Sequence, residues 1–176
     1  GAPVTAQTPI LLTSCGQSPG PTMVKVFLGR LGLDHEFLEM ARAQDLVAAQ
    51  QAGKPYRSLI IVTGASLKGM GAAGVAMPDE LARTAALIAE AKRQGITIIG
   101  SHVEGMSRRA QGAAPGDNSD EQSIDAVMPN AQVMVIRSDG NEDRRFSIIS
   151  EGKKIPLVLF EKNMEMGTAF GSLFKK

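Results

Sequence analysis

The chain has 176 residues, and its 19 basic side chains are nearly balanced by 18 acidic ones. This balance excludes the strongly basic surface expected of a protein that binds nucleic acid or an anionic membrane. Hydrophobic residues make up 43% of the chain, ordinary for a globular protein, and no apolar stretch approaches the roughly 20 residues of a membrane helix.

Short apolar runs and amphipathic segments then alternate from the N-terminal end onward. An apolar run over 9–13 predicts the first strand, and apolar residues spaced by four over 21–31 predict a helix. A weaker strand is predicted over 35–40 and a short helix over 44–52. The continuous apolar run over 58–63 predicts a strand buried on both faces, which is typical of a parallel sheet.

The second half of the chain continues the alternation after a glycine-rich loop over 64–74. The strongest helix signal covers 78–94, where Leu81, Ala85 and Ile88 form the predicted apolar stripe. The remaining predicted elements are a strand over 96–101, a helix over 119–128, a strand over 132–137, a helix capped by Asn141, a strand over 156–160 and a helix from about 163.

Six such β/α units predict an α/β fold. We expect a three-layer sandwich with a mostly parallel, doubly wound sheet of about six strands. The predicted strand order is 2-1-3-4-5 with the sixth strand added at the edge, a flavodoxin-like winding. The whole chain, 1–176, is predicted to be one domain, with a flexible N-terminal segment over 1–8.

Two loops rich in glycine and small hydroxyl residues follow the first and third predicted strands. With this strand order they meet where the winding reverses, which is where ligands bind in open α/β sheets. Such loops bring backbone N–H groups close to a ligand, so we predict a small carboxylate, sulfate or phosphate there. The predicted ligand-binding residues are Ser14, Gly16, Gln17, Ser18, Gly64, Ser66, Lys68, Gly69, His102 and Arg108.

The same glycines are equally consistent with tight turns that bind nothing, because glycine suits turns for conformational reasons alone. The segment from Gly69 to Gly74 spells G-x-G-x-x-G, but it does not directly follow a strand, and chance explains it better than a dinucleotide site. Gly64 and Gly69 have the spacing of a nucleotide-hydrolase phosphate loop, but Met70 stands where that loop requires lysine.

Residues 13–18, after the first strand, resemble the phosphate loop of flavodoxins. Cys15 and Ser18 replace threonines of that pattern, and the predicted site loops contain no aromatic residue to cover a flavin ring. FMN is therefore kept only as an alternative ligand.

Three further features at the same edge can each be interpreted either as functional or as merely structural. Cys15 near a helix N-terminus suits a nucleophile, but a lone cysteine after a strand is more often a small buried side chain. His102 either hydrogen-bonds a ligand or is a polar rim residue, and Arg108 and Arg109 either close over an anion or form a solvated pair. With two histidines and one cysteine in the chain, no metal site is predicted.

Three segments together resemble a family of bacterial exported proteins classed as a domain of unknown function. They are TSCGQSPG over 13–20, GASLKGMGAAG over 64–74 and IPLVLFEK over 155–162. The resemblance covers nearly the whole chain and implies a removed signal peptide and a periplasmic or extracytoplasmic location, which agrees with a chain that begins without methionine. It implies no reaction. The site that it marks consists of Thr13, Ser14, Gly16, Gln17, Ser18, Gly64, Ser66, Lys68 and Gly69.

The sequence thus predicts an exported protein that binds a small anionic molecule at the carboxyl ends of the first and third strands. One alternative is a flavodoxin-like FMN-binding redox module or a small-molecule enzyme. The other is a protein-interaction domain of an envelope complex. No nucleic-acid partner and no membrane insertion are expected, and association into a homodimer stays open.

Overall fold

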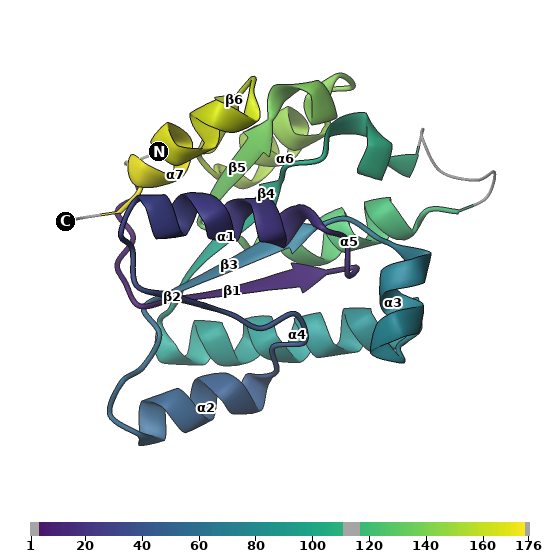
Figure 1. Cartoon of the computed structure of the whole chain (residues 1–176). Coiled ribbons are helices and arrows are strands. Elements are labelled where there is room, and N and C mark those ends of the chain that lie inside the picture. The colour runs from purple at the N-terminus through teal and green to yellow at the C-terminus, as the bar shows by residue number, and fades with distance from the viewer. Residues whose placement is uncertain (1–3, 111–116, 175–176) are drawn as a thin grey trace.

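The structure, a computed structural model, describes residues 4–110 and 117–174. Its centre is one six-stranded sheet in which every neighbouring pair of strands is parallel (Figure 1). The strands are β1 (Ile10–Cys15), β2 (His35–Phe37), β3 (Ser58–Thr63), β4 (Thr97–His102), β5 (Val133–Arg137) and β6 (Leu157–Phe160). Their order, β2-β1-β3-β4-β5-β6, confirms the predicted doubly wound topology.

Helices cover both faces of the sheet and complete the three layers. On one face α1 and α7 pack over alternate residues of the strands, and on the other face α2, α4, α5 and α6 pack over the intervening residues. The helices are α1 (Gly20–Arg30), α2 (Ala43–Gln51), α3 (Leu67–Ala73), α4 (Met77–Gln94), α5 (Ser119–Val127), α6 (Arg145–Lys153) and α7 (Met166–Gly171). None of the described helices is long and apolar enough to cross a membrane.

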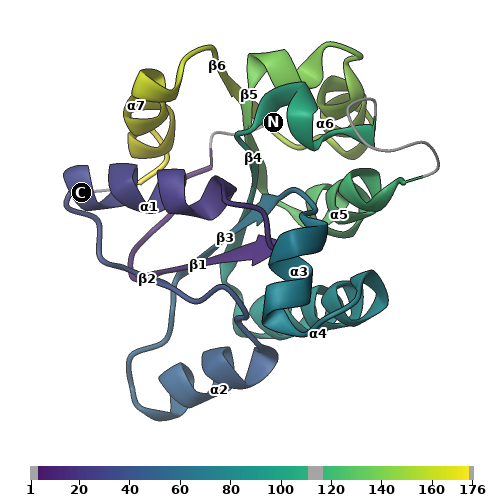
Figure 2. The ribbon, with the colours of Figure 1, turned by 45° about the vertical axis from the view of Figure 1, so that its right-hand side comes forward.

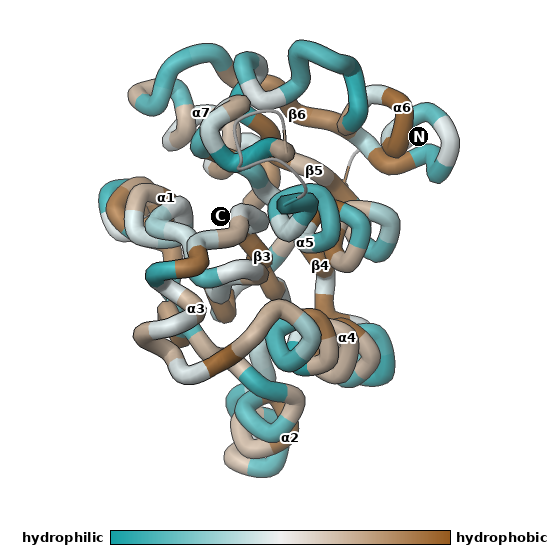
Figure 3. Tube along the Cα trace, turned by 90° about the vertical axis from the view of Figure 1, so that its right-hand side faces the viewer, coloured by the Kyte–Doolittle hydropathy of each residue, from teal (hydrophilic) through white to brown (hydrophobic). Residues whose placement is uncertain are grey.

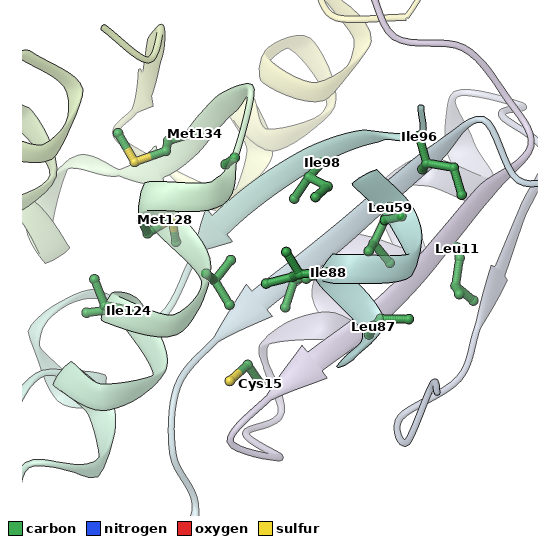
Figure 4. Packing of buried hydrophobic residues seen from close by; sticks show 14 of the residues in the cluster. Leu11, Cys15, Leu59, Leu87, Ile88, Ile96, Ile98, Ile124, Met128 and Met134 are labelled. Atoms are coloured by element: carbon green, nitrogen blue, oxygen red, sulfur yellow. The ribbon is translucent and has the colours of Figure 1, made fainter. Parts of the chain in front are cut away.

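The central strands are buried along their whole length because both faces are covered. Every residue of β1 and β3 is buried. Figure 3 shows the hydrophobic strands in the middle of the molecule with more hydrophilic helical surfaces around them. Figure 4 shows the larger side of this core, where Leu87 and Ile88 of α4 lie against Leu59 and Ile98 of the sheet.

Two elements differ from the sequence-based prediction. The loop predicted over 64–74 contains a helix, α3, which begins after Ser66 and ends at Gly74 in the left-handed conformation. In α4 the predicted stripe is wrong, since Ala85 is exposed. The buried face of α4 is Glu80, Arg83, Thr84, Leu87, Ile88 and Ala91. Charged residues fill the first turns of that face, so hydrophobicity could not reveal it.

Part of the N-terminal segment 1–8, which was predicted to be flexible, contacts the rest of the domain. Residues 1–3 lie outside the described part of the chain. Ala6 is fully buried, and its N–H donates to the carbonyl of Leu173 at 2.6 Å. Ser58 Oγ likewise donates to the carbonyl of Gln7 at 2.6 Å.

Candidate functional site

The turns that leave β1 and β3 lie side by side, as the predicted topology requires. Parallel pairing runs to Cys15 and Thr63, and beyond it the Ser66 N–H donates to the Gly16 carbonyl at 2.8 Å. Gly16 has φ +109°, and a Cβ there would lie 2.2 Å from the carbonyl oxygen of Gly64. Only glycine therefore allows the two turns to approach this closely.

The backbone N–H groups of these turns donate to the protein's own carboxylates. The donor and acceptor pairs are Gly16 with Glu80 at 2.8 Å, Gly20 with Glu104 at 3.1 Å, and Ala65 with Asp120 at 2.7 Å. These three carboxylates take the positions that we expected an external anion to occupy. The amides that we expected to bind an anion are present, but carboxylates of the protein itself accept their hydrogen bonds.

Glu80 is the centre of this arrangement and is fully buried. Its carboxylate accepts two hydrogen bonds from Arg83, at 2.9 and 3.0 Å, and one from the Gln17 side chain at 2.9 Å. Arg83 in turn donates to the carbonyls of Ser14 and Ala41. The pair therefore ties the end of β1 to the segment that follows β2.

The pKa values of two of these carboxyl groups are shifted in opposite directions, although burial raises both. For Glu80, burial opposes ionisation, but the hydrogen bonds from Arg83, Gln17 and Gly16 outweigh it and hold the pKa below its usual range. For Asp120, burial dominates over the hydrogen bond from Ala65 and raises the pKa.

His102, Arg108 and Arg109, which the sequence placed beside a ligand, each contact other groups of the protein. His102 is fully buried between Thr63 Oγ1 and the Gly105 carbonyl, each at 3.0 Å, and burial lowers its pKa, which keeps the ring neutral. Arg108 donates to Glu104 and to the carbonyl of Ala65.

Arg109 is buried in this structure and does not extend over the turns of β1 and β3. It forms salt bridges with Glu121 at 3.0 Å and Asp143 at 2.6 Å, and it lies over the ring of Phe146. The pairing with two carboxylates explains how a guanidinium is accommodated with no exposed side-chain surface.

Of the predicted residues of the second loop, Lys68 and Gly69 lie on α3, which stands across the end of β1 (Figure 2), whereas Gly64 and Ser66 precede this helix. Ser66 caps this helix by accepting a hydrogen bond from the Gly69 N–H at 2.9 Å. Lys68 is exposed on it. Because the G-x-G-x-x-G segment forms a helix and its end, it is not a loop that cradles a dinucleotide phosphate.

Cys15 does not have the surroundings of a nucleophile. Its side chain is fully buried in the hydrophobic cluster beneath the sheet (Figure 4). Burial raises the pKa of the thiol to about 11. A protonated, buried thiol supports the plainer interpretation of a packing residue.

A pocket of about 290 Å³ lies between the ends of β1 and β2 and α3. Four predicted ligand-binding residues, Ser14, Gln17, Ser18 and Gly69, line it. The other lining residues, which the prediction missed, are Thr22, Phe37, Glu39, Ala72 and Ala73. None of the described lining residues is Lys or Arg, so its one charged group is the exposed Glu39 carboxylate.

A family model described as a domain of unknown function, DUF6305, matches residues 7–174. The chain belongs to the DUF6305 family. No curated protein sequence matches it significantly.

Solved structures similar to this DUF6305 chain include esterases and lipases. One is the psychrotrophic esterase EstA from Pseudoalteromonas sp., at 9% identity and a TM-score of 0.39, with 96% of each chain covered. Another is a GDSL-like lipase from Bacteroides thetaiotaomicron, at 12% identity and a TM-score of 0.39, with 93% of this chain and 83% of that chain covered. Likenesses this weak carry no argument about activity.

In the part of the DUF6305 chain that the structure describes, Ser14, Ser18 and the histidines do not form a hydrolytic dyad. Ser14 Oγ accepts a hydrogen bond from the Gln17 N–H, and both ring nitrogens of His102 are engaged elsewhere. His35 begins β2 but does not line the pocket, and its Nδ1 lies 2.7 Å from the carbonyl oxygen of Leu33. Within the described residues, then, no histidine stands beside Ser14 or Ser18 as a general base. These residues also contain no group of three His, Cys, Asp or Glu side chains placed to hold a metal ion.

Proposed function

We propose that this chain binds a small molecule with hydrogen-bond donors, specifically an amine, in the pocket between β1, β2 and α3. The observation that carries the proposal is the character of the pocket lining. It combines the hydroxyl groups of Ser14, Ser18 and Thr22 with the Glu39 carboxylate and contains no cationic side chain among the described residues. Such a lining is complementary to a cation that also forms hydrogen bonds.

The residues around the pocket divide the recognition between them. Glu39 supplies the negative charge, and the Phe37 ring supplies an apolar and π-rich wall against which an ammonium group is stabilised. Gln17 is held in place because its side chain already donates to the Glu39 carbonyl and to Glu80. The pocket volume, about 290 Å³, is near the lower end of the roughly 300–1,000 Å³ of small-molecule sites.

This proposal keeps the predicted place of the site and changes the predicted charge of its ligand. An anion at the turns of β1 and β3 would have to displace Glu80, Glu104 or Asp120 from the amides they occupy. The same argument disfavours FMN, whose phosphate would compete for the amides of Gly16 and Gly20.

The test is a thermal-shift and calorimetry screen of the purified chain with four ligand classes: primary amines, polyols, carboxylates and phosphates, with FMN among the last. We expect amines to raise the melting temperature and phosphates to leave it unchanged. Glu39→Gln should weaken amine binding by roughly tenfold, since one charge-assisted hydrogen bond is lost. Glu161→Gln, which removes an exposed carboxylate outside the pocket, is the matched control.

The proposal fails if no amine binds, or if Glu39→Gln and Glu161→Gln weaken binding equally. Binding of phosphates in preference to amines would instead restore the anionic ligand. Uptake of FMN, visible as a yellow protein, would restore the redox alternative.

The extracytoplasmic location stays a prediction. Fractionation of cells that express the gene, followed by detection of the chain in the periplasmic or the cytoplasmic fraction, tests it directly. A partner captured with the envelope fraction would favour the interaction-domain alternative.

A further inference from the structure

The two edges of the sheet differ in a way that the fold itself does not require. The β2 edge carries His35 and Glu36, polar side chains of the kind that protect an exposed strand from pairing with another chain. The β6 edge has the sequence Leu-Val-Leu-Phe, with no charge and no proline inside the strand. Among the described strands β6 pairs with β5 alone, so its outer row of backbone donors and acceptors is open.

Apolar surface surrounds this open edge on both faces of the sheet. Leu159 of β6 is 48% exposed and Ile148 of α6 is 59% exposed. A hollow of about 270 Å³ lies between β6 and α7, lined by Val158, Leu159, Phe160, Glu165, Thr168, Ala169 and Ser172. Figure 1 shows β6 at the margin of the molecule, with α7 beside it, and Figure 3 shows the strand's hydrophobic colouring.

We propose that β6 pairs antiparallel with β6 of a second copy of this chain, so that two sheets join into one across a two-fold axis. A two-fold axis perpendicular to the sheet produces an antiparallel pair and uses the same surface on both copies. This inference is independent of the proposed ligand pocket, which lies beside β1 and β2.

The alternation of side chains limits the register of such a pair. Val158 and Phe160 belong to the cluster on the α7 face, whereas Leu157 packs on the opposite face. Directly opposed residues in a sheet point to the same face, so a residue of one copy can oppose only residues an even number of positions away in the other copy. One residue therefore lies on the two-fold axis, opposite the same residue of the second copy. The two registers that pair the most residues of β6 place either Val158 or Leu159 on the axis, next to the hollow that the partner's side chains would fill.

The charges that flank β6 favour the antiparallel arrangement. Lys153 and Lys154 precede the strand, and Glu161, Lys162 and Glu165 follow it. Antiparallel pairing brings the doubly positive end of one copy beside the net negative end of the other. Pairing in the opposite sense would place like charges together.

Two four-residue strands alone bury less than the roughly 1,200 Å² of a stable interface, so the contact must extend to the neighbouring helices. The surface available for this continues across α7, because a second hollow of about 560 Å³ between α1 and α7 shares Thr168 and Ser172 with the first. Met164, which is 87% exposed after β6, lies at this second hollow. Its exposure matches a surface that a partner covers.

Light scattering coupled to size-exclusion chromatography, with sedimentation velocity over a range of concentrations, tests the proposal. We expect a concentration-dependent dimer that Leu159→Lys shifts toward monomer by at least tenfold in dissociation constant. Leu67→Lys is the control, because Leu67 is an exposed apolar residue, at 70%, on α3 and lines neither hollow. A monomer at all concentrations, or an equal effect of both variants, would overturn the proposal.

Disulfide trapping distinguishes β6 pairing from any other dimer. Val158→Cys and Leu159→Cys are oxidised with copper phenanthroline, and Glu36→Cys on the other edge serves as the control. The native Cys15 does not interfere because it is buried. A covalent dimer from one of the β6 variants and none from Glu36→Cys supports the proposal, and equal trapping at both edges contradicts it.

Discussion

The carboxylate of Glu80 accepts a hydrogen bond from the amide of Gly16, 64 positions earlier in the chain, at 2.8 Å. Through this contact the first turn of α4 closes the end of β1. The amide of the glycine-rich turn is thus already hydrogen-bonded within the protein. The open volume lies beside this turn, in the pocket next to Glu39. The loop after β1, whose composition suggested an anion site, instead forms one wall of the pocket beside Glu39.

Replacement of Glu80 by glutamine should strongly destabilise the chain. The variant leaves the buried guanidinium of Arg83 without its carboxylate, and loss of one partner from a buried pair costs about 3–5 kcal/mol. The free energy of unfolding in urea measures the effect. Glu151→Gln removes the carboxylate of an exposed pair, that of Glu151 with Arg144, and should change the midpoint little. Equal midpoints for both variants would contradict the assigned role.

The contribution of Glu80 should also depend on pH in a defined direction. Its folded pKa lies below the ordinary value of 4.5, so the folded state binds its proton less readily than the unfolded state. The stability it supplies is fully present above pH 4.5 and is lost as the pH falls through the folded pKa. The difference in unfolding free energy between the wild type and Glu80→Gln should therefore shrink only below pH 4.5. A constant difference down to pH 3 would show that the hydrogen bonds do not favour the ionised form.

Cys15 should be unreactive in the folded chain. Because burial raises the pKa of its thiol to about 11, almost no thiolate exists at pH 8, and the sulfur is inaccessible as well. Ellman's reagent should detect no thiol in the native protein and one per chain in denaturant. A Val26→Cys variant supplies an exposed thiol as the positive control. Rapid native reaction of the wild type would restore Cys15 as a candidate nucleophile.

Two adjacent arginines should respond very differently to alanine. Arg109 is enclosed, lies over the Phe146 ring and is paired with Glu121 and Asp143, so Arg109→Ala should cost about 2–4 kcal/mol because it opens a cavity and removes buried hydrogen bonds. Arg108 is partly exposed and contacts Glu104, so Arg108→Ala should cost only about 0–1 kcal/mol. Chemical denaturation of both variants gives the comparison. A larger loss for Arg108→Ala would contradict the burial and pairing described above.

The fold was predictable because its signal is apolar periodicity, which a single sequence displays. The run from Ser58 to Thr63 matches β3 at both ends. Of the candidate site, the sequence predicted that the turns after β1 and β3 lie side by side, but not the groups that contact them. Glu80 and Asp120 look like ordinary first-turn acids of α4 and α5, and nothing local shows that their side chains turn inward to amides on other elements. Glu39 follows a weak edge strand, and its place in a pocket depends on how α3 closes over it.

Two glycines of α3 provide a sharp test of that closure. A Cβ on Gly69 would lie 2.1 Å from the carbonyl oxygen of Gln17, a backbone atom that cannot move without shifting the β1 turn. Gly69→Ala should therefore destabilise the chain by roughly 1–3 kcal/mol and disturb the pocket that Gly69 lines. Thermal unfolding and ligand binding measure both effects.

Gly71, one position beyond Met70 in the same helix, is the matched control. A Cβ there would meet nothing within 4 Å, and its φ is not positive, so alanine fits without strain. Because alanine is favoured over glycine inside a helix, Gly71→Ala should stabilise the chain by up to about 0.5–1 kcal/mol. If both variants behave alike, α3 does not pack against the β1 turn as described, and the pocket loses one of its walls.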